Sequence, residues 1–239
     1  MTYYKILLLN IFISVAICSP TSSNDTIKQI RGCTTSNHIE NDNSEVSSDT
    51  VKDKVKIDVY YESLCPFSVK FFVTQLKPAV QRLGSHLDIH LIPYGHAETR
   101  RVAGRYKFWC QHGNPECFGN AVQACAIDVM RNTIRAVYFN TCLMQYTSYY
   151  DDYQHFQTVF NWCGYQEKAD VKEIWNCVNS SRGPNLLKRY GDETHALAPP
   201  YVPYLMIDDS PEHQDEATDH LITTVCQMLR PRPLVCSLY

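Results

Sequence analysis

The chain has 239 residues, of which 44% are hydrophobic and 20% are charged, and its formal net charge at pH 7 is −3. These values are ordinary for a globular protein, and the length allows one large domain or two small ones. A slightly acidic chain without a long basic run gives no reason to expect nucleic-acid binding.

The first 54 residues have the features of a targeting segment followed by a polar leader. Lys5 precedes the apolar stretch Ile6–Ile17, and Ala16 and Cys18 are small residues at the −3 and −1 positions of a cleavage site. We predict a secretory signal peptide over residues 1–18, with a buried N-terminal helix as the alternative. The stretch is shorter than the roughly 20 apolar residues of a membrane-spanning helix, so no membrane span is predicted. Residues 19–54 are polar and aperiodic, which predicts a flexible leader.

Ordered structure is expected over residues 55–239, which we predict to form one domain. Apolar and polar residues alternate over 55–61 and again over 87–91, and this period of two predicts two strands. Residues 67–83 between them are predicted to form a helix. Cys65 then stands at the helix N-terminus, and a cysteine in that place of a strand–helix–strand unit indicates a thioredoxin-like fold.

The section from about residue 97 to residue 198 differs from the strand–helix–strand unit before it in cysteine content and in the spacing of its apolar residues. It carries six of the eleven cysteines, and its apolar residues recur at helical spacing. These features predict a disulfide-braced helical insertion. Beyond it, residues 201–207 are predicted to return to a strand, and a closing helix is predicted from about Glu216 to Leu229.

Eleven cysteines indicate an oxidising compartment, because disulfides persist there. Cys18 belongs to the signal peptide, Cys33 lies in the leader, and Cys65 is a candidate nucleophile. The other eight can close four disulfides, whose connectivity the sequence does not decide: Cys110, Cys117, Cys125, Cys142, Cys163, Cys177, Cys226 and Cys236. Two N-x-S/T sequons, at Asn24 and Asn179, fit a glycosylated secretory protein.

The run from Cys110 to Cys125 reads C-Q-H-G-N-P-E-C-F-G-N-A-V-Q-A-C. It matches the pattern C-Q-H-G-x-x-E-C-x-x-N-x-x-x-x-C, and by this pattern the chain resembles the gamma-interferon-inducible lysosomal thiol reductase (GILT) family. The resemblance extends from about Val55 to Cys236. It implies an α/β, thioredoxin-like fold with a helical insertion. It also implies reduction of disulfides in protein substrates, in acidic endocytic compartments or after secretion.

Pro203 is a further site residue that the resemblance implies. In thioredoxin-like folds a cis-proline faces the active-site cysteine and lines the substrate groove, and Val202–Pro203 occupies the matching place. Only about 5% of X-Pro bonds in folded proteins are cis, so the resemblance carries this prediction. A trans proline at the start of an edge strand is the alternative.

Ser68 departs from the C-x-x-C active site of the family, because the tetrapeptide here is Cys65-Pro66-Phe67-Ser68. In a dithiol reductase the first cysteine attacks as a thiolate and the second resolves the mixed disulfide. A serine hydroxyl cannot perform the second step. We therefore predict that Cys65 acts as a single catalytic nucleophile and that an external thiol is the reductant. Cys33 is a conceivable resolving thiol, and an inert, buried Cys65 is the alternative.

Three functions stay open at this point. The chain is a monothiol reductase or isomerase, a covalent trap for partners, or a secreted binding protein that keeps the fold without reductase activity. The first is favoured because Cys65, Pro66, Pro203 and the long motif are all present. The location is predicted to be extracellular or lysosomal and endosomal, reached through the secretory pathway.

Other site chemistries are disfavoured by the sequence. A zinc site in the Cys110–Cys125 run would lack the usual paired C-x-x-C or H-x-x-x-H spacing. No histidine stands in a recognised protease context beside Cys65, and no Gly-rich phosphate loop or dinucleotide fingerprint is present, so no cofactor is predicted. The polar residues of the run could hold a turn, cap a helix or contact substrate: Gln111, His112, Glu116 and Asn120.

Overall fold

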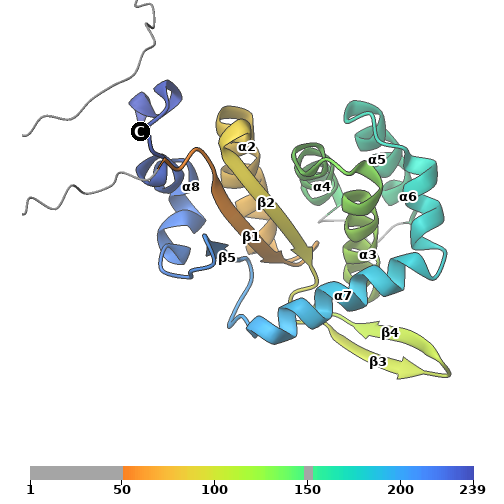
Figure 1. The fold of residues 1–239 in the computed structure, drawn as a ribbon. Helices are drawn as coiled ribbons and strands as arrows, with labels where there is room; N and C mark the ends of the chain where they lie inside the picture. The colour runs from red at the N-terminus through yellow and green to blue at the C-terminus, as the bar shows by residue number, and fades with distance from the viewer. Residues whose placement is uncertain (1–50, 148–152) are drawn as a thin grey trace, which may run out of the picture. The chain divides into compact units, whose positions relative to one another are not determined.

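A computed structural model describes residues 51–147 and 153–239 (Figure 1). Contacts within the chain separate Met1–Val46 from a compact unit, Ser47–Tyr239, to which all the elements below belong. The predicted signal peptide, Cys33, the Asn24 sequon and nearly all of the predicted leader lie outside the described residues. None of the helices in the described ranges is long and apolar enough to cross a bilayer.

A three-stranded sheet in the order β2-β1-β5 lies at the centre of this unit (Figure 1). Strand β1 (Val55–Tyr61) pairs in parallel with β2 (Leu87–Pro93) and antiparallel with β5 (Tyr204–Ile207). The predicted strands at 55–61 and 87–91 are confirmed. The third strand is shorter than the predicted 201–207, because it begins only after Pro203, which has no N–H to donate to a sheet ladder.

A single helical crossover joins the two parallel strands, as parallel pairing requires. It consists of α1 (Pro66–Phe71), a π-helical turn (Phe72–Leu76) and α2 (Lys77–Leu83), and a short 3-10 turn (Gly84–His86) leads into β2. The helix predicted over 67–83 is therefore present and starts one residue earlier. The strand–helix–strand unit places Cys65 at the helix start, as the sequence predicts.

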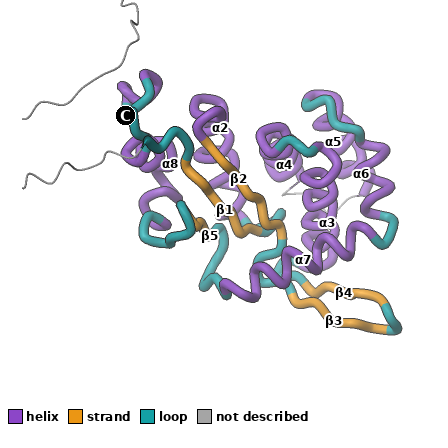
Figure 2. The backbone as a smooth tube through the Cα atoms, viewed as in Figure 1, coloured by secondary structure: helices purple, strands orange, loops and turns teal. Residues whose placement is uncertain are grey.

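The insertion between β2 and β5 begins with a hairpin rather than a helix, so the expectation of a wholly helical insertion over 97–198 is wrong at its start. Strands β3 (Glu98–Val102) and β4 (Arg105–Trp109) form a separate two-stranded sheet, seen beside α7 in Figure 2. Ala103 and Gly104 both have positive φ at the turn, which suits a two-residue hairpin loop. The hairpin is mostly exposed, so it carries no apolar alternation that would reveal it.

Helices make up the rest of the insertion and the C-terminal region. The insertion contains α3 (Gly113–Met130), α4 (Thr133–Thr147), α5 (Tyr153–Gln166), α6 (Val171–Val178) and α7 (Arg182–Leu197). The chain closes with α8 (Gln214–Met228), close to the predicted 216–229, and the 3-10 helix Leu234–Leu238.

Four disulfides pair all eight of the cysteines set aside for bridging. They are Cys110–Cys117, Cys125–Cys177 between α3 and α6, Cys142–Cys163 between α4 and α5, and Cys226–Cys236. The last one ties α8 to the C-terminal tail, as expected. Among the described cysteines, Cys65 alone keeps a free thiol.

Two apolar cores lie on the two faces of the sheet. The alternate residues Val55, Ile57, Val59 and Tyr61 of β1 face a core completed by α1, α2, α4 and α8. Tyr60 and the β2 residue Ile92 face the other core, to which α3, α5, α6 and α7 contribute. The loop Glu62–Leu64, which follows β1, therefore lies between the helical layer that begins after Cys65 and the helical layer that contains the Cys110–Cys125 run.

Candidate active site

Cys65 occupies the N-cap position of α1, immediately after the loop Glu62–Leu64 that follows β1. Its backbone is extended (φ −62°, ψ 121°), and Pro66 fills the first helical position, where no amide donor is needed. The thiol is free, and the residue is 7% exposed. An anionic sulfur in this place faces the unpaired N–H groups and the positive dipole end of the helix. The position therefore suits a thiolate nucleophile.

The segment before β5 lies directly against this sulfur. The Val202–Pro203 bond is cis, and the Sγ atom of Cys65 lies 3.7 Å from the carbonyl oxygen of Val202. Gln214 of α8 accepts the N–H of Leu205 and donates to the Pro203 carbonyl at 3.5 Å, which fixes the start of the strand. The structure thus brings Cys65 and Pro203 together, while their catalytic roles stay predictions.

Ser68 lies one helical turn after Cys65 and is fully buried. Its Oγ accepts the backbone N–H of Glu62 at 3.4 Å. The hydroxyl that replaces a second thiol therefore helps to hold the loop that leads to Cys65. A resolving role for Ser68 has no chemical basis, because an alcohol is far less acidic than a thiol.

The start of α3 clamps the same loop from the other side. Asn120 Oδ1 accepts the backbone N–H of Ser63 at 2.8 Å, and Ser63 Oγ donates to the carbonyl of Glu116 at 3.1 Å. Gly119 permits this close approach, since a Cβ there would lie 2.5 Å from Ser63 Oγ. Glu116 and Asn120 are four residues apart and so share one helix face. The motif residues hold the active-site loop, which was one of the roles left open from the sequence.

Glu62 and Glu116 form a buried cluster with His112. His112 Nδ1 lies 2.5 Å from Glu116 Oε2 and 3.6 Å from Glu62 Oε2, and the His112 backbone N–H donates to Glu116 Oε1 at 3.1 Å. Both carboxylates are fully buried. Burial, and then the charge of Glu116, raise the pKa of Glu62 to about 7, opposed by the His96 N–H and by His112.

Gln111, Gly95 and His96 complete the surroundings of Glu62. The His96 backbone N–H donates to Glu62 Oε1 at 2.8 Å. With its amide nitrogen turned toward Glu62, Gln111 donates to both carboxylate oxygens, at 3.3 and 3.2 Å. Gly95 has φ +61°, and a Cβ there would lie 2.2 Å from Glu62 Cγ. We did not single out Glu62 or Ser63 from the sequence, although both stand shortly before Cys65 along the chain.

A metal would compete with bonds that already exist in this cluster. Glu62, His112 and Glu116 place ligand-type atoms within 4.8 Å of one another, but His112 Nδ1 is already engaged by Glu116 Oε2. Cys110, Cys117 and Cys125 are all bound in disulfides, so their sulfurs are not ligands. We assign no metal to this site.

Exposed aromatic side chains lie in the two chain segments that meet at the Cys65 sulfur. Phe67, two residues after Cys65, is 72% exposed, and Tyr201, just before Val202, is 46% exposed. Tyr201 donates its hydroxyl to Asp215 at 3.0 Å, which orients its ring. The Phe67 segment and the Tyr201 segment therefore each present an exposed aromatic ring, which can make apolar contacts with a bound molecule.

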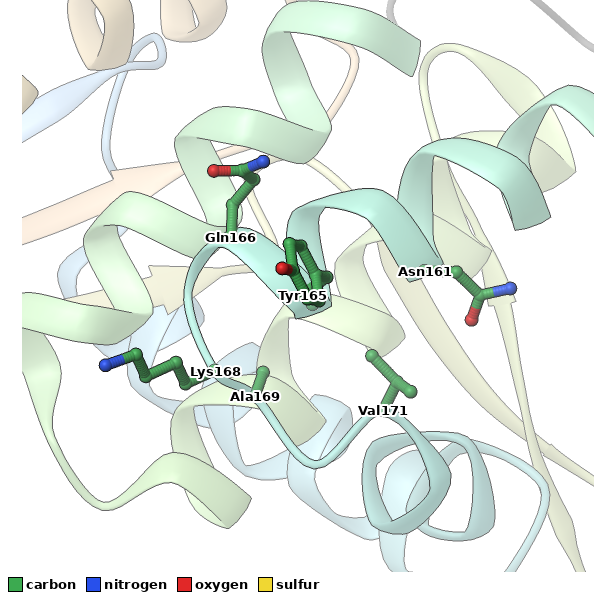
Figure 3. Close-up of a pocket in the computed structure, with 7 residues that line it drawn as sticks. Asn161, Tyr165, Gln166, Lys168, Ala169 and Val171 are labelled. Carbon is green, nitrogen blue, oxygen red and sulfur yellow. The ribbon is translucent and has the colours of Figure 1, made fainter.

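A separate hollow lies on the insertion, between the end of α5 and the start of α6. Figure 3 shows it with Asn161, Tyr165, Lys168 and Val171 among the residues around it. It contains no residue of the Cys65 site, and none of the residues around it is a cysteine. Among the described residues the one free thiol is that of Cys65, and it does not line this hollow.

Comparison with known proteins finds the same family in the family models and among the curated relatives. The family model described as gamma interferon inducible lysosomal thiol reductase (GILT) matches residues 56–167, which include Cys65, Ser68 and the whole Cys110–Cys125 run. A GILT-like protein of Anopheles gambiae is 33% identical, over 77% of this chain and 80% of its own. The GILT of Carassius auratus is 32% identical, over 76% of this chain and 72% of its own.

Solved structures show the same fold at low sequence identity. A candidate protein disulfide isomerase from Nitrosomonas europaea superposes with a TM-score of 0.50 and 9% identity, over 74% of this chain and 99% of that one. The predicted thioredoxin-like α/β fold with a disulfide-braced insertion is thereby confirmed.

Proposed function

Because this chain belongs to the gamma-interferon-inducible lysosomal thiol reductase family, we propose that it is a thiol-disulfide oxidoreductase that acts on protein disulfides through a single nucleophile, Cys65. The observation that carries the single-cysteine mechanism is the pairing of a free thiol at the N-cap of α1 with a serine, not a cysteine, one turn later. The Val202 carbonyl, 3.7 Å from Cys65 Sγ, brings the segment before β5 against the free thiol, which supports Cys65 as the reacting group.

The reaction begins when the Cys65 thiolate attacks one sulfur of a substrate disulfide. The substrate S–S bond breaks, a mixed disulfide forms with Cys65, and the departing substrate sulfur takes up a proton. An external thiolate then attacks the Cys65 sulfur and releases the second substrate thiol. Cys65 is then joined to the first external thiol in a new mixed disulfide. A second external thiolate attacks the external sulfur, the bond to Cys65 breaks, and Cys65 is free again. One substrate disulfide is reduced, and two external thiols are oxidised to one disulfide.

The setting that we propose is a secretory or endolysosomal compartment. Four disulfides join eight cysteines in the described part of the chain, and such bridges persist where the medium is oxidising. The names of the relatives point to the lysosome. Protein substrates that are partly unfolded in such a compartment would expose their disulfides, which could then reach the slightly exposed Cys65.

The second candidate is a binding protein that has kept the fold and lost turnover. The fully buried Ser68 favours it, because its hydroxyl holds the loop and no second free thiol is found among the described residues to resolve a mixed disulfide. Recognition would then rest on the insertion and would survive Cys65→Ser, whereas disulfide exchange would not.

The test is a single-turnover reaction of the purified mature protein with a disulfide-containing peptide, followed by intact-mass spectrometry. We expect one mixed disulfide per chain, located at Cys65, and its release by glutathione. Cys65→Ser is the control and should form none. If the native protein forms no adduct while the unfolded protein does, the oxidoreductase proposal fails and the binding protein becomes the better reading.

A further inference from the structure

The Glu62–His112–Glu116 cluster takes no part in the exchange steps, yet it lies beside the loop that carries the nucleophile. Glu62 stands three residues before Cys65, and its carboxylate is fully buried, as is that of Glu116. Only His112 reaches solvent, with 39% of its side chain exposed. Two buried carboxylates that share one imidazole are costly unless protons reduce their charge.

The charge of the cluster depends on its proton count. With both carboxylates ionised and the imidazole neutral, two negative charges are held away from water. One proton on His112 leaves one negative charge, and a second proton, on a carboxyl group, leaves none. The raised pKa of Glu62, about 7, agrees with this electrostatic pressure toward proton uptake.

The neighbours of Glu62 offset only part of the cost of ionising its buried carboxylate: the His96 N–H and His112 lower its pKa, while burial and Glu116 raise it. The turn after β2 supplies only the uncharged Gly95 and the backbone N–H of His96, and the segment before α3 supplies the Gln111 amide and His112. Helix α3 supplies Glu116. In the described part of the chain, no lysine or arginine forms an ion pair with either carboxylate.

Movement of Glu62 would reach Cys65 through the backbone. The N–H of Glu62 donates to Ser68 Oγ in the first turn of the nucleophile's own helix. The next residue, Ser63, is held by Asn120 Oδ1 and by the carbonyl of Glu116. The same α3 residue, Glu116, therefore binds the cluster through its side chain and the loop through its backbone.

Resting on the proposed function above, we propose that Glu62 is a positioning residue for Cys65. A proton taken up by the Glu62–His112–Glu116 cluster holds the Glu62–Leu64 loop in place, and loss of that proton loosens the loop and misplaces the sulfur. Exchange by Cys65 is then fastest, relative to a simple thiol, in acidic medium. Glutamine at position 62 mimics the protonated carboxyl group and fixes the loop at all pH values.

The first experiment measures the reaction of Cys65 with 2,2′-dipyridyl disulfide, which stays reactive in acid, at pH values from about 5 to about 8. Cys65 attacks one sulfur, the probe S–S bond breaks, and 2-thiopyridone leaves with a proton. Each rate constant is divided by that of N-acetylcysteine at the same pH, which removes the ordinary ionisation of a thiol. The variants are Glu62→Gln and, as the matched control, Glu212→Gln, whose side chain is exposed in the turn before α8.

For the wild type we expect the normalised rate to fall about tenfold across this range, the size of effect that misplacement of a nucleophile produces. Glu62→Gln should keep a high, flat normalised rate, and Glu212→Gln should follow the wild type. An unchanged pH profile in a folded Glu62→Gln variant overturns the proposal. A metal chelator should leave every profile unchanged, and a chelator-dependent profile would also overturn it.

A second measurement separates this proposal from the proposed function and does not depend on any variant folding. Hydrogen–deuterium exchange of the wild type, corrected for intrinsic pH dependence, reports protection of the Ser63 amide that Asn120 accepts. We expect that protection to fall as pH rises through about 7. If Cys65 never reacts, the proposed function fails while this readout still decides the positioning claim. Constant protection of the Ser63 amide contradicts the positioning claim.

Discussion

The backbone N–H of Ser63 donates to Asn120 Oδ1 at 2.8 Å, across 57 positions of sequence. This bond joins the approach to Cys65 to the first turns of α3, and both partners are buried. Together with the Ser63–Glu116 bond, it holds the cysteine-rich run against the loop that leads to Cys65, the proposed nucleophile.

Asn120→Ala should therefore weaken both the fold and the reaction. The Ser63 N–H would be left buried without an acceptor, which costs about 1–3 kcal/mol in the free energy of unfolding. A loosened loop should slow Cys65 exchange by about tenfold or more. Urea denaturation and the rate of mixed-disulfide formation measure the two effects. Asn176→Ala, at an exposed position of α6, is the control and should change neither.

Ser68→Cys should restore the missing resolving step. Residue 68 follows Cys65 by one helical turn, on the same side of α1, where a second thiol can reach the first. We expect an internal disulfide with Cys65 in the oxidised variant and multiple turnovers of an insulin-type substrate with glutathione. Ser68→Ala is the control, because it removes the hydroxyl bonded to Glu62 without adding a thiol. Turnover by Ser68→Cys no faster than by the wild type contradicts this assignment.

Much of the fold follows from sequence patterns whose physical cause is local. The alternation over 55–61 predicts β1 because its odd-numbered residues must face one core, and they do. The Cys65 position at a helix start follows from strand–helix–strand spacing. The hairpin β3–β4 could not be predicted in this way, because it is polar and faces solvent, and only its turn residues carry a signal.

The residues of the candidate site also fall into two groups, those that the sequence could predict and those that it could not. Cys65, Ser68 and Pro203 could be named from a motif, because each occupies a fixed place along the chain. Glu62 could not, since its importance arises from tertiary contacts with Glu116 and His96 that no spacing reveals. The four disulfides show the same limit, because the connectivity depends on which helices pack together.

Removal of Cys125–Cys177 should destabilise the protein more than removal of Cys110–Cys117. The first closes a loop with a sequence separation of 52, and the second closes one of only 7. Loop-closure entropy in the unfolded chain gives about 4 kcal/mol for the longer loop and about 2–3 kcal/mol for the shorter. Thermal unfolding of the two paired Cys→Ala variants, under conditions that keep the other disulfides, measures the difference. Equal losses would show that strain or residual structure outweighs loop entropy.

Gly95→Ala should disturb the Glu62 carboxylate directly. An added Cβ would lie 2.2 Å from Glu62 Cγ, and the Glu62 side chain is fully buried, so one of the two must shift. Gly104→Ala is a matched control, because Gly104 also has positive φ (+80°) but nothing lies within 4 Å of its added Cβ. Both variants should lose about 1 kcal/mol from backbone strain. Only Gly95→Ala should lose more and alter the Cys65 rate.

Glu62 should also make the stability of the protein depend on pH. Its pKa is raised from the ordinary 4.5 to about 7, so folding favours the protonated carboxyl group. Between these pH values the folded state binds more protons than the unfolded state, and the free energy of unfolding must fall as pH rises. The change attributable to Glu62 is at most about 3 kcal/mol, and less where Glu116 and His112 share the protons.

Glu62→Gln removes this titrating group, so its unfolding free energy should lose that part of the slope. Relative to the wild type, the variant should gain stability as pH rises from about 4.5 to about 7 and keep a constant advantage above that range. Urea titrations at intervals across the range measure both proteins, with Glu212→Gln to correct for the loss of a surface carboxylate. Parallel curves for the wild type and Glu62→Gln would contradict the raised pKa of Glu62, because the folded and unfolded states would then bind its proton equally well.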